Sequence, residues 1–151
     1  MPVETGVFTV GVFKDVEWAA RGIDALKRKG IPAEALSVVA KESPDVAACI
    51  DAAVGHAAAR IDLARLGPVL AVGPLVTALD GEQHDLAGLG LAGTMRRVGF
   101  QPHDGQIFET LTGKGGVLVA IHSEPRAADA LAVLHAYGGG NAAIGAWAGR
   151  L

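Results

Sequence analysis

The first forty residues contain two different patterns of apolar positions. Residues 7–13 form an almost unbroken apolar run, which is typical of a strand buried on both faces. Residues 16–26 then carry apolar side chains at helical spacing, after Asp15, a good N-cap residue. Gly30 ends this helical pattern, and residues 36–40, LSVVA, predict a second strand. The apolar face of the predicted helix comprises Val16, Ala19, Ala20, Ile23 and Leu26.

The same succession returns near the other end of the sequence. Residues 117–121 predict another strand buried on both faces, Ser123 is a candidate cap, and Gly138 ends a second helical pattern. Residues 142–147 then predict an edge strand. Two such β-α-β units predict an α+β, ferredoxin-like fold, with one antiparallel sheet, both apolar strands at its centre and two helices on one face.

The length suits a single domain over residues 1–151. Within it we place one β-α-β unit at residues 6–41 and the other at 116–147. The segment between them, residues 42–115, is too long for a plain loop in a compact domain, so it must carry structure of its own.

This insertion is predicted to be mainly helical and rich in glycine. Residues 44–65 are Ala-rich and partly helical in pattern, and residues 68–72 predict a short strand. Helices are predicted at 85–98 and 104–112. We expect the insertion to pack against the sheet or to form an oligomer interface.

Composition narrows the choice of partners. Charged residues make up 19% of the chain, below the ~25% of ordinary soluble domains, which favours a homo-oligomer that covers part of this surface. The net charge is −3 and no basic stripe is present, so nucleic acid is not an expected partner. The one basic cluster, residues 27–29, falls in the last turn of a predicted helix, where cations suit the helix dipole.

The expected cellular location rests on three features that the sequence lacks: a membrane-spanning stretch, a signal-peptide pattern and a pair of cysteines. Residues 66–79 form the longest apolar stretch, which is too short for a membrane-spanning helix. The first residues show no signal-peptide pattern, and Cys49, the only cysteine, cannot form an intrachain disulfide. We therefore expect a cytoplasmic protein without a membrane span.

The strongest motif match is to a dinucleotide-binding loop, but its context is wrong. Gly88, Gly90 and Gly93 spell G-x-G-x-x-G, yet the polar residues 80–85 stand where a strand should precede it. A glycine-rich helix face packed against a neighbour is the favoured interpretation. The histidines lack metal-ligand spacing, so neither a cofactor nor a metal is expected.

Four residues are candidates for ligand binding. His122 ends a predicted central strand just before a helix, a place where ligands bind in open α/β sheets. Trp18, Trp147 and Tyr137 are large amphipathic side chains that could line a pocket or an interface. The alternative is structural, with each of the three covering an edge of the core.

Three segments together resemble a known family. They are VGVFKDVEWAARGIDALKRKGIPAEALSVVAK, GPVLAVGPLVTALDG, and the stretch from GLGLAGTMRRVGF to ALAVLHAYG. In their strand, cap, helix and Gly-Pro order they are similar to the bacterial general-stress-protein domain of the heat-induced YflT type. The resemblance covers nearly the whole chain. It implies a cytoplasmic bacterial protein linked to stress, and it brings no accepted catalytic residue.

Three kinds of function remain open. The sequence favours a non-enzymatic, stress-associated accessory protein that acts through self-association or a protein partner. The alternative is a small-molecule-binding sensor with an intersubunit or sheet-edge pocket, which rests on fold analogy. The third hypothesis is a small cofactor-free enzyme that uses His122 or His103 as a base. No catalytic residue is assigned.

Overall fold

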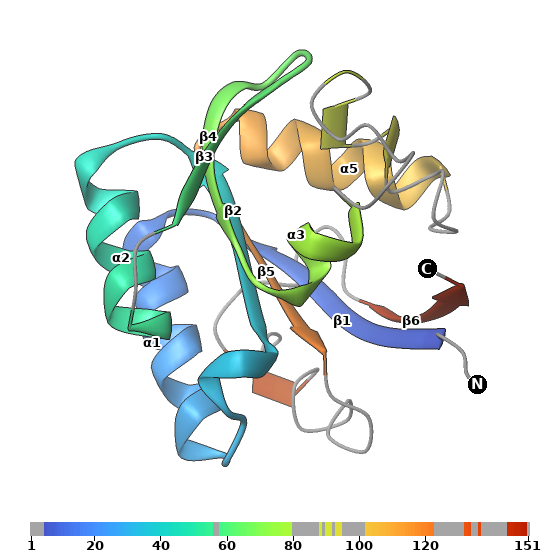
Figure 1. The fold of residues 1–151 in the computed structure, drawn as a ribbon. Coiled ribbons are helices and arrows are strands. Elements are labelled where there is room, and N and C mark those ends of the chain that lie inside the picture. The colour runs from blue at the N-terminus through green and yellow to red at the C-terminus, as the bar shows by residue number, and fades with distance from the viewer. Residues whose placement is uncertain are drawn as a thin grey trace.

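The protein is built on one antiparallel sheet with helices on both sides (Figure 1). The computed structural model describes residues 5–55, 58–79, 88, 90, 91, 93, 94, 102–122, 132, 133, 136 and 145–150. The elements are β1 (Thr5–Phe13), α1 (Val16–Arg28), the 3-10 turn η1 (Ala33–Ala35), β2 (Leu36–Lys41), α2 (Pro44–Val54), β3 (Ala59–Leu63), β4 (Gly67–Val72), α3 (Pro74–Leu79), α5 (Pro102–Gly113), β5 (Val117–His122) and β6 (Gly145–Arg150).

The six strands lie in the order β3-β4-β2-β5-β1-β6, and every neighbouring pair is antiparallel. The two apolar strands predicted to be central, β1 and β5, pair directly, with Val10 opposite Ala120 and Phe13 opposite Val117. Strand β2 pairs with the other side of β5. The last predicted strand does lie at an edge, but at Gly145–Arg150 rather than at residues 142–147.

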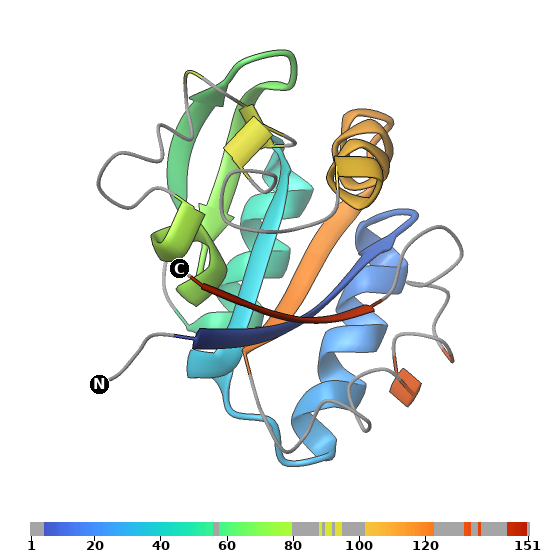
Figure 2. The same cartoon turned by 90° about the vertical axis from the view of Figure 1, so that its right-hand side faces the viewer.

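Both faces of the sheet are buried, each under its own hydrophobic core. The first core joins the sheet to α1 and α2, and the second joins it to α3 and α5. Figure 1 shows the two helical layers on opposite sides of the strands, and Figure 2 views the sheet from the side of α3 and α5, with α1 and α2 behind it. Along β5 the residues alternate between the cores, since Val119 belongs to the first and Leu118 to the second, both fully buried. The prediction placed the helices of the two β-α-β units on one face, and residues of α1 and the helical residue Val133 both belong to the first core. The insertion packs against the sheet, which is one of the two expectations for it, and supplies α3 and α5 to the other face.

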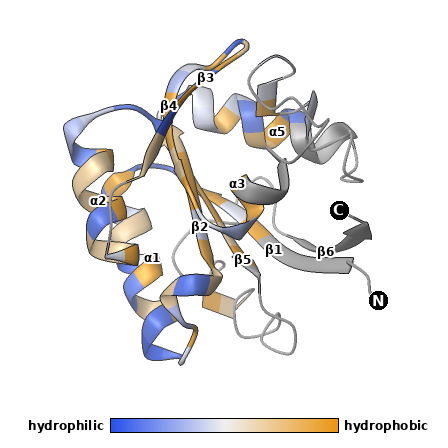
Figure 3. Ribbon diagram, in the orientation of Figure 1, coloured by the Kyte–Doolittle hydropathy of each residue, from blue (hydrophilic) through white to orange (hydrophobic). Residues whose placement is uncertain are grey.

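Helix α1 begins where the sequence predicts. The Asp15 carboxylate accepts a hydrogen bond from the Trp18 backbone N–H at 2.9 Å, which satisfies one of the free donors of the first turn. Apolar residues of α1 face the sheet and charged ones face outward (Figure 3). Ala20, predicted to be buried, is exposed, whereas Gly22 and Ala25 are buried in its place.

The insertion is less helical than predicted, because it adds two strands to the sheet. Helix α2 occupies the first half of the Ala-rich segment, with Ser43 as its N-cap and Gly55 as its C-cap. Beyond it, β3 pairs with β4, and β4 pairs with β2. The strand predicted at residues 68–72 is thus confirmed as β4, while β3 was missed. Helix α5 is longer than the helix predicted at 104–112.

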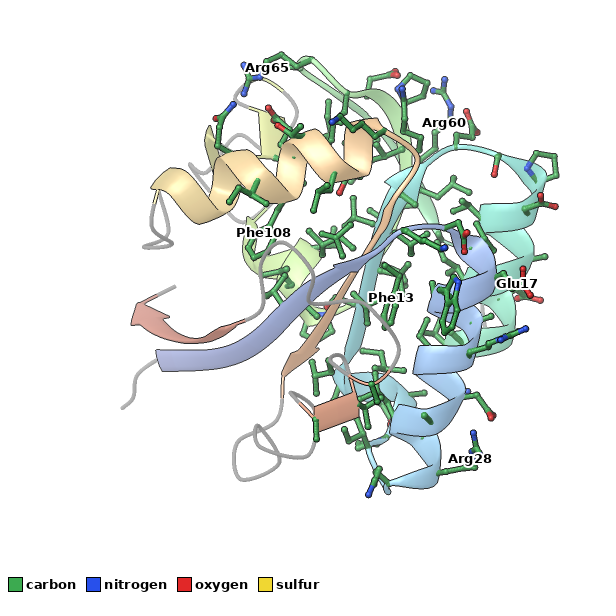
Figure 4. All side chains as sticks on the ribbon, turned by 180° about the vertical axis from the view of Figure 1, so that it is seen from behind. Phe13, Glu17, Arg28, Arg60, Arg65 and Phe108 are labelled. Carbon is green, nitrogen blue, oxygen red and sulfur yellow. The ribbon has the colours of Figure 1, made fainter. Side chains whose placement is uncertain are left out.

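A glycine in α1 creates the space for the fully buried ring of Phe13. Phe13, fully buried, lies between the sheet and α1 (Figure 4). A Cβ atom added at Gly22 would overlap the Cζ atom of this ring. The absent side chain therefore lets α1 approach the sheet closely.

We predict that Gly22→Ala destabilises the protein. In an ordinary helix interior this substitution stabilises by about 1 kcal/mol, but here overpacking against Phe13 should reverse the sign and cost roughly 1–3 kcal/mol. Urea unfolding followed by circular dichroism measures the change. Phe13→Leu in the Gly22→Ala background should cost less than Phe13→Leu alone. Additive effects in this double-mutant cycle would contradict the proposed clash.

Candidate functional site

The backbone brings two of the four candidate ligand-binding residues close together. In the register of β1, Phe8 lies opposite His122 of β5 on one side and opposite Trp147 of β6 on the other. Trp18 lies on α1, which covers the first core, and Tyr137 lies outside the described residues. The four candidates therefore do not form one described site.

Trp18 covers the edge of the first core. Its side chain is partly buried against that core. Lys14 Nζ lies 5.7 Å from the centroid of the indole ring, and Arg21 Cζ lies 5.2 Å from it. Two cations over one indole ring are typical of cation–π contacts on a protein surface. These contacts support the structural interpretation of Trp18.

A concavity lies at the C-terminal end of α1, and we name it the α1-end pocket. It has a volume of about 520 Å³ and is open to solvent. Its described lining comes from the last turns of α1 and from helical residues between β5 and β6: Ala25, Arg28, Lys29, Ala132, Val133 and Ala136. Apolar side chains thus form its wall, and two cations stand beside them.

A smaller groove of about 230 Å³ lies between α1 and α2. Its lining includes Cys49, Ala20 and Lys27, and the Lys27 ammonium group donates a hydrogen bond to the Ala52 carbonyl at 3.3 Å. Cys49 is buried, and burial raises the pKa of its thiol. A raised pKa keeps the thiol protonated at neutral pH, so the environment does not activate Cys49 as a nucleophile.

A paired buried carboxylate joins the β3–β4 turn to α5. Glu109 is only 6% exposed, and Arg65 contacts both of its oxygens, with Nε to Oε1 at 2.9 Å and Nη2 to Oε2 at 3.3 Å. Arg65 has a φ of 74°, which is a left-handed conformation that side chains rarely adopt. Figure 4 shows Arg65 at the α5 side of the molecule. The ion pair raises the pKa of the Arg65 guanidinium further above its usual range.

Gly90, the middle glycine of G-x-G-x-x-G, packs against this ion pair. Its φ is 81°, and an added Cβ would lie 2.8 Å from the Ala64 carbonyl oxygen and 3.0 Å from Arg65 Nη2. The close approach supports the packing interpretation at Gly90, whereas Gly88 is exposed and Gly93 is partly buried. Sequence reasoning missed the Arg65–Glu109 pair, since 44 residues separate the two and neither belongs to a motif.

The other described buried polar side chains hold the backbone in place. Ser37 Oγ accepts a hydrogen bond from the Leu75 N–H at 2.9 Å, and thereby caps α3 from strand β2. Thr94 and Thr112 each donate to the carbonyl four residues earlier, at Gly90 and Phe108. These hydroxyls are engaged in maintaining the fold.

The two edges of the sheet differ in charge. At the β3 edge, Arg60 is ion-paired with Glu42 at 2.9 Å and with Asp62 at 3.4 Å, and all three side chains are substantially exposed. Strand β6, GAWAGR, carries its only charge at Arg150. Charged side chains protect an edge strand against pairing with other chains, so β3 is protected in a way that β6 is not.

Comparison with known proteins identifies no relative. No protein-family model matches the sequence, and neither a curated protein nor a solved structure matches it. Among the described residues, no three His, Cys, Asp or Glu side chains are grouped so that they could hold a metal ion. None of the described helices is long and apolar enough to cross a membrane.

At most positions a glycine variant is less stable than an alanine variant. We predict that the left-handed backbone at Arg65 reverses this order of stability. Both Arg65→Ala and Arg65→Gly remove the contact to Glu109, but only glycine relaxes the left-handed φ. Arg65→Gly should therefore be more stable than Arg65→Ala by about 1 kcal/mol, as measured by urea unfolding. Ala59→Gly in β3, where φ is not positive, provides the control and should be destabilising. An Arg65→Ala variant as stable as Arg65→Gly would contradict the argument.

We predict slow alkylation of Cys49 in the native protein. Burial and the raised thiol pKa both lower the concentration of accessible thiolate. Iodoacetamide at pH 8 should modify Cys49 at least about tenfold more slowly in the folded protein than in urea, as followed by mass spectrometry. Equal rates in the two states would show that the thiol is accessible.

Proposed function

We propose that this chain is a non-enzymatic interaction protein that acts through self-association, with β6 as the strand that pairs with a second copy. The observation that carries the proposal is the unequal protection of the two sheet edges. The β3 edge carries the exposed ion pairs of Arg60, whereas β6 is a six-residue edge strand with a single charge at its end.

The pairing has a simple geometry. On one side β6 is hydrogen-bonded to β1 from Gly145 to Arg150, and no described strand lies on its other side. An edge strand presents alternate backbone N–H and C=O groups outward. Two β6 strands related by a two-fold axis would satisfy each other's outward groups in antiparallel pairing, which is a self-complementary interface.

Two further observations support an interaction role. The low charged fraction of 19% is consistent with a surface that is partly covered by another subunit. In addition, all four described buried polar side chains have partners within the fold: Ser37, Thr94 and Thr112 are hydrogen-bonded to backbone groups of helices, and Glu109 is paired with Arg65. The stress association and bacterial cytoplasmic location implied by the family resemblance stay predictions.

The scaffold for this interaction is proposed to be ferredoxin-like, built from two β-α-β units. Support comes from the strand order β2-β5-β1-β6, in which β1 and β5 occupy the two inner positions. The helical residues Ala132, Val133 and Ala136 fall between β5 and β6, where the second unit requires a helix. Strands β4 and β3 would then extend this core beyond β2.

We predict that the protein is a dimer and that a charge on β6 weakens it. Ala148→Lys places an edge-protecting cation on β6 and should raise the dimer dissociation constant by about tenfold or more, as measured by analytical ultracentrifugation. Ala59→Lys places the same charge on the already protected β3 edge and should leave the dissociation constant unchanged. Circular dichroism verifies that both variants fold.

The unmodified protein provides an independent test through amide hydrogen exchange. Alternate β6 amides should exchange quickly in dilute solution and slowly at high concentration, because pairing satisfies the outward N–H groups. A wild-type protein that stays monomeric at every soluble concentration would refute the proposal. An equal effect of Ala59→Lys would place the interface elsewhere than on β6.

A further inference from the structure

The α1-end pocket combines two features that suit one class of ligand. Its volume of about 520 Å³ falls within the range of small-molecule sites, roughly 300–1,000 Å³. The wall consists of the side chains of Ala25, Ala132, Val133 and Ala136, and no acidic residue is among its described lining. Val133 is 5% exposed and belongs to the first core, so this wall is anchored to the body of the protein.

The charge beside the wall is positive. Arg28 and Lys29 both line the pocket, at the last residue and the C-cap of α1. Arg28 is paired with Asp24 at 3.0 Å, but both side chains are about two-thirds exposed. A solvated pair of this kind contributes little to stability, so the guanidinium can exchange Asp24 for another carboxylate at small cost.

We infer that the α1-end pocket binds a small anionic amphiphile, with one carboxylate head and an aliphatic tail. The head would pair with Arg28 and Lys29, and the tail would lie along the alanine and valine wall. The end of a helix ordinarily repels anions, because its carbonyl groups carry partial negative charge. Here the backbone N–H groups of Lys29, Gly30 and Ile31 already engage carbonyls of the last turn, and the side chains of Arg28 and Lys29 bring positive charge to this end of the helix.

Titration with decanoate below its micelle concentration tests the inference, with binding measured by isothermal titration calorimetry. Decanoate should bind saturably, whereas acetate, which lacks the tail, and decyltrimethylammonium, which reverses the charge, should not. The double variant Arg28→Ala/Lys29→Ala should weaken decanoate binding by about tenfold or more. Lys14→Ala/Arg21→Ala removes two other exposed cations near α1, keeps the same net charge as the first double variant, and should leave binding unchanged.

A second pair of variants tests the apolar wall. Ala136→Glu brings bulk and negative charge into the pocket and should abolish decanoate binding, whereas Ala47→Glu, on the exposed part of α2, should not. Equal weakening by the two double variants, equal binding of the cationic amphiphile, or no saturable binding of decanoate would overturn the inference. Binding only to phosphatidylglycerol vesicles would also overturn it, because it would identify a membrane surface instead of a free ligand.

This inference stands apart from self-association, because β6 contributes no described residue to the pocket lining. A protein that is monomeric yet binds decanoate would support the pocket and refute the dimer. A dimer that does not bind decanoate would support self-association and refute the ligand-binding pocket.

Discussion

Burial of β5 on both of its faces is the constraint on which the rest of the structure depends. Residues Val117 to Ile121 are all at most 1% exposed, and each belongs to one of the two cores. A strand with no polar position requires a helical layer above and below it, and a neighbouring strand on each side. The β-α-β pattern that precedes the insertion provides α1 and both neighbouring strands, β1 and β2. The insertion adds α2 to the layer of α1 and provides the other layer, α3 and α5, so it is an integral part of the fold.

Patterns of neighbouring residues predicted the elements that depend on local interactions. They did not predict the features that depend on contacts between residues distant in sequence. The Asp15 cap, the two apolar strands β1 and β5 and the short strand before Gly73 all follow from patterns of neighbouring residues. Strand β3 could not be predicted, because only Leu63 of its five residues is buried and because it joins the sheet only through β4. Ala20 was misplaced because Gly22, which carries no apolar side chain, occupies the helix face against Phe13.

The candidate sites show the same division. Sequence reasoning selected aromatic and histidine residues, since those side chains carry recognisable chemistry. The two surfaces that support the proposals instead consist of small or backbone groups: alanines beside Arg28 and Lys29, and the open edge of β6. Neither surface has a sequence motif. The wall of the pocket is formed by segments distant in sequence, and the sheet edge depends on which strand lies outermost. From the sequence alone, the basic cluster of residues 27–29 indicates only a favourable interaction with the helix dipole.

The hydrogen bond from Leu75 to Ser37 has a consequence for how the chain folds. Helix α3 has only six residues, too few to persist alone, and its described cap is a hydroxyl 38 residues earlier, on β2. The cap is in position only after β2 has joined the sheet, so α3 should form late, upon a surface that already exists. An insertion stabilised in this way by its host cannot be excised or transplanted as an autonomous module. An insertion of different length must still place the Leu75 N–H within hydrogen-bonding distance of the Ser37 hydroxyl.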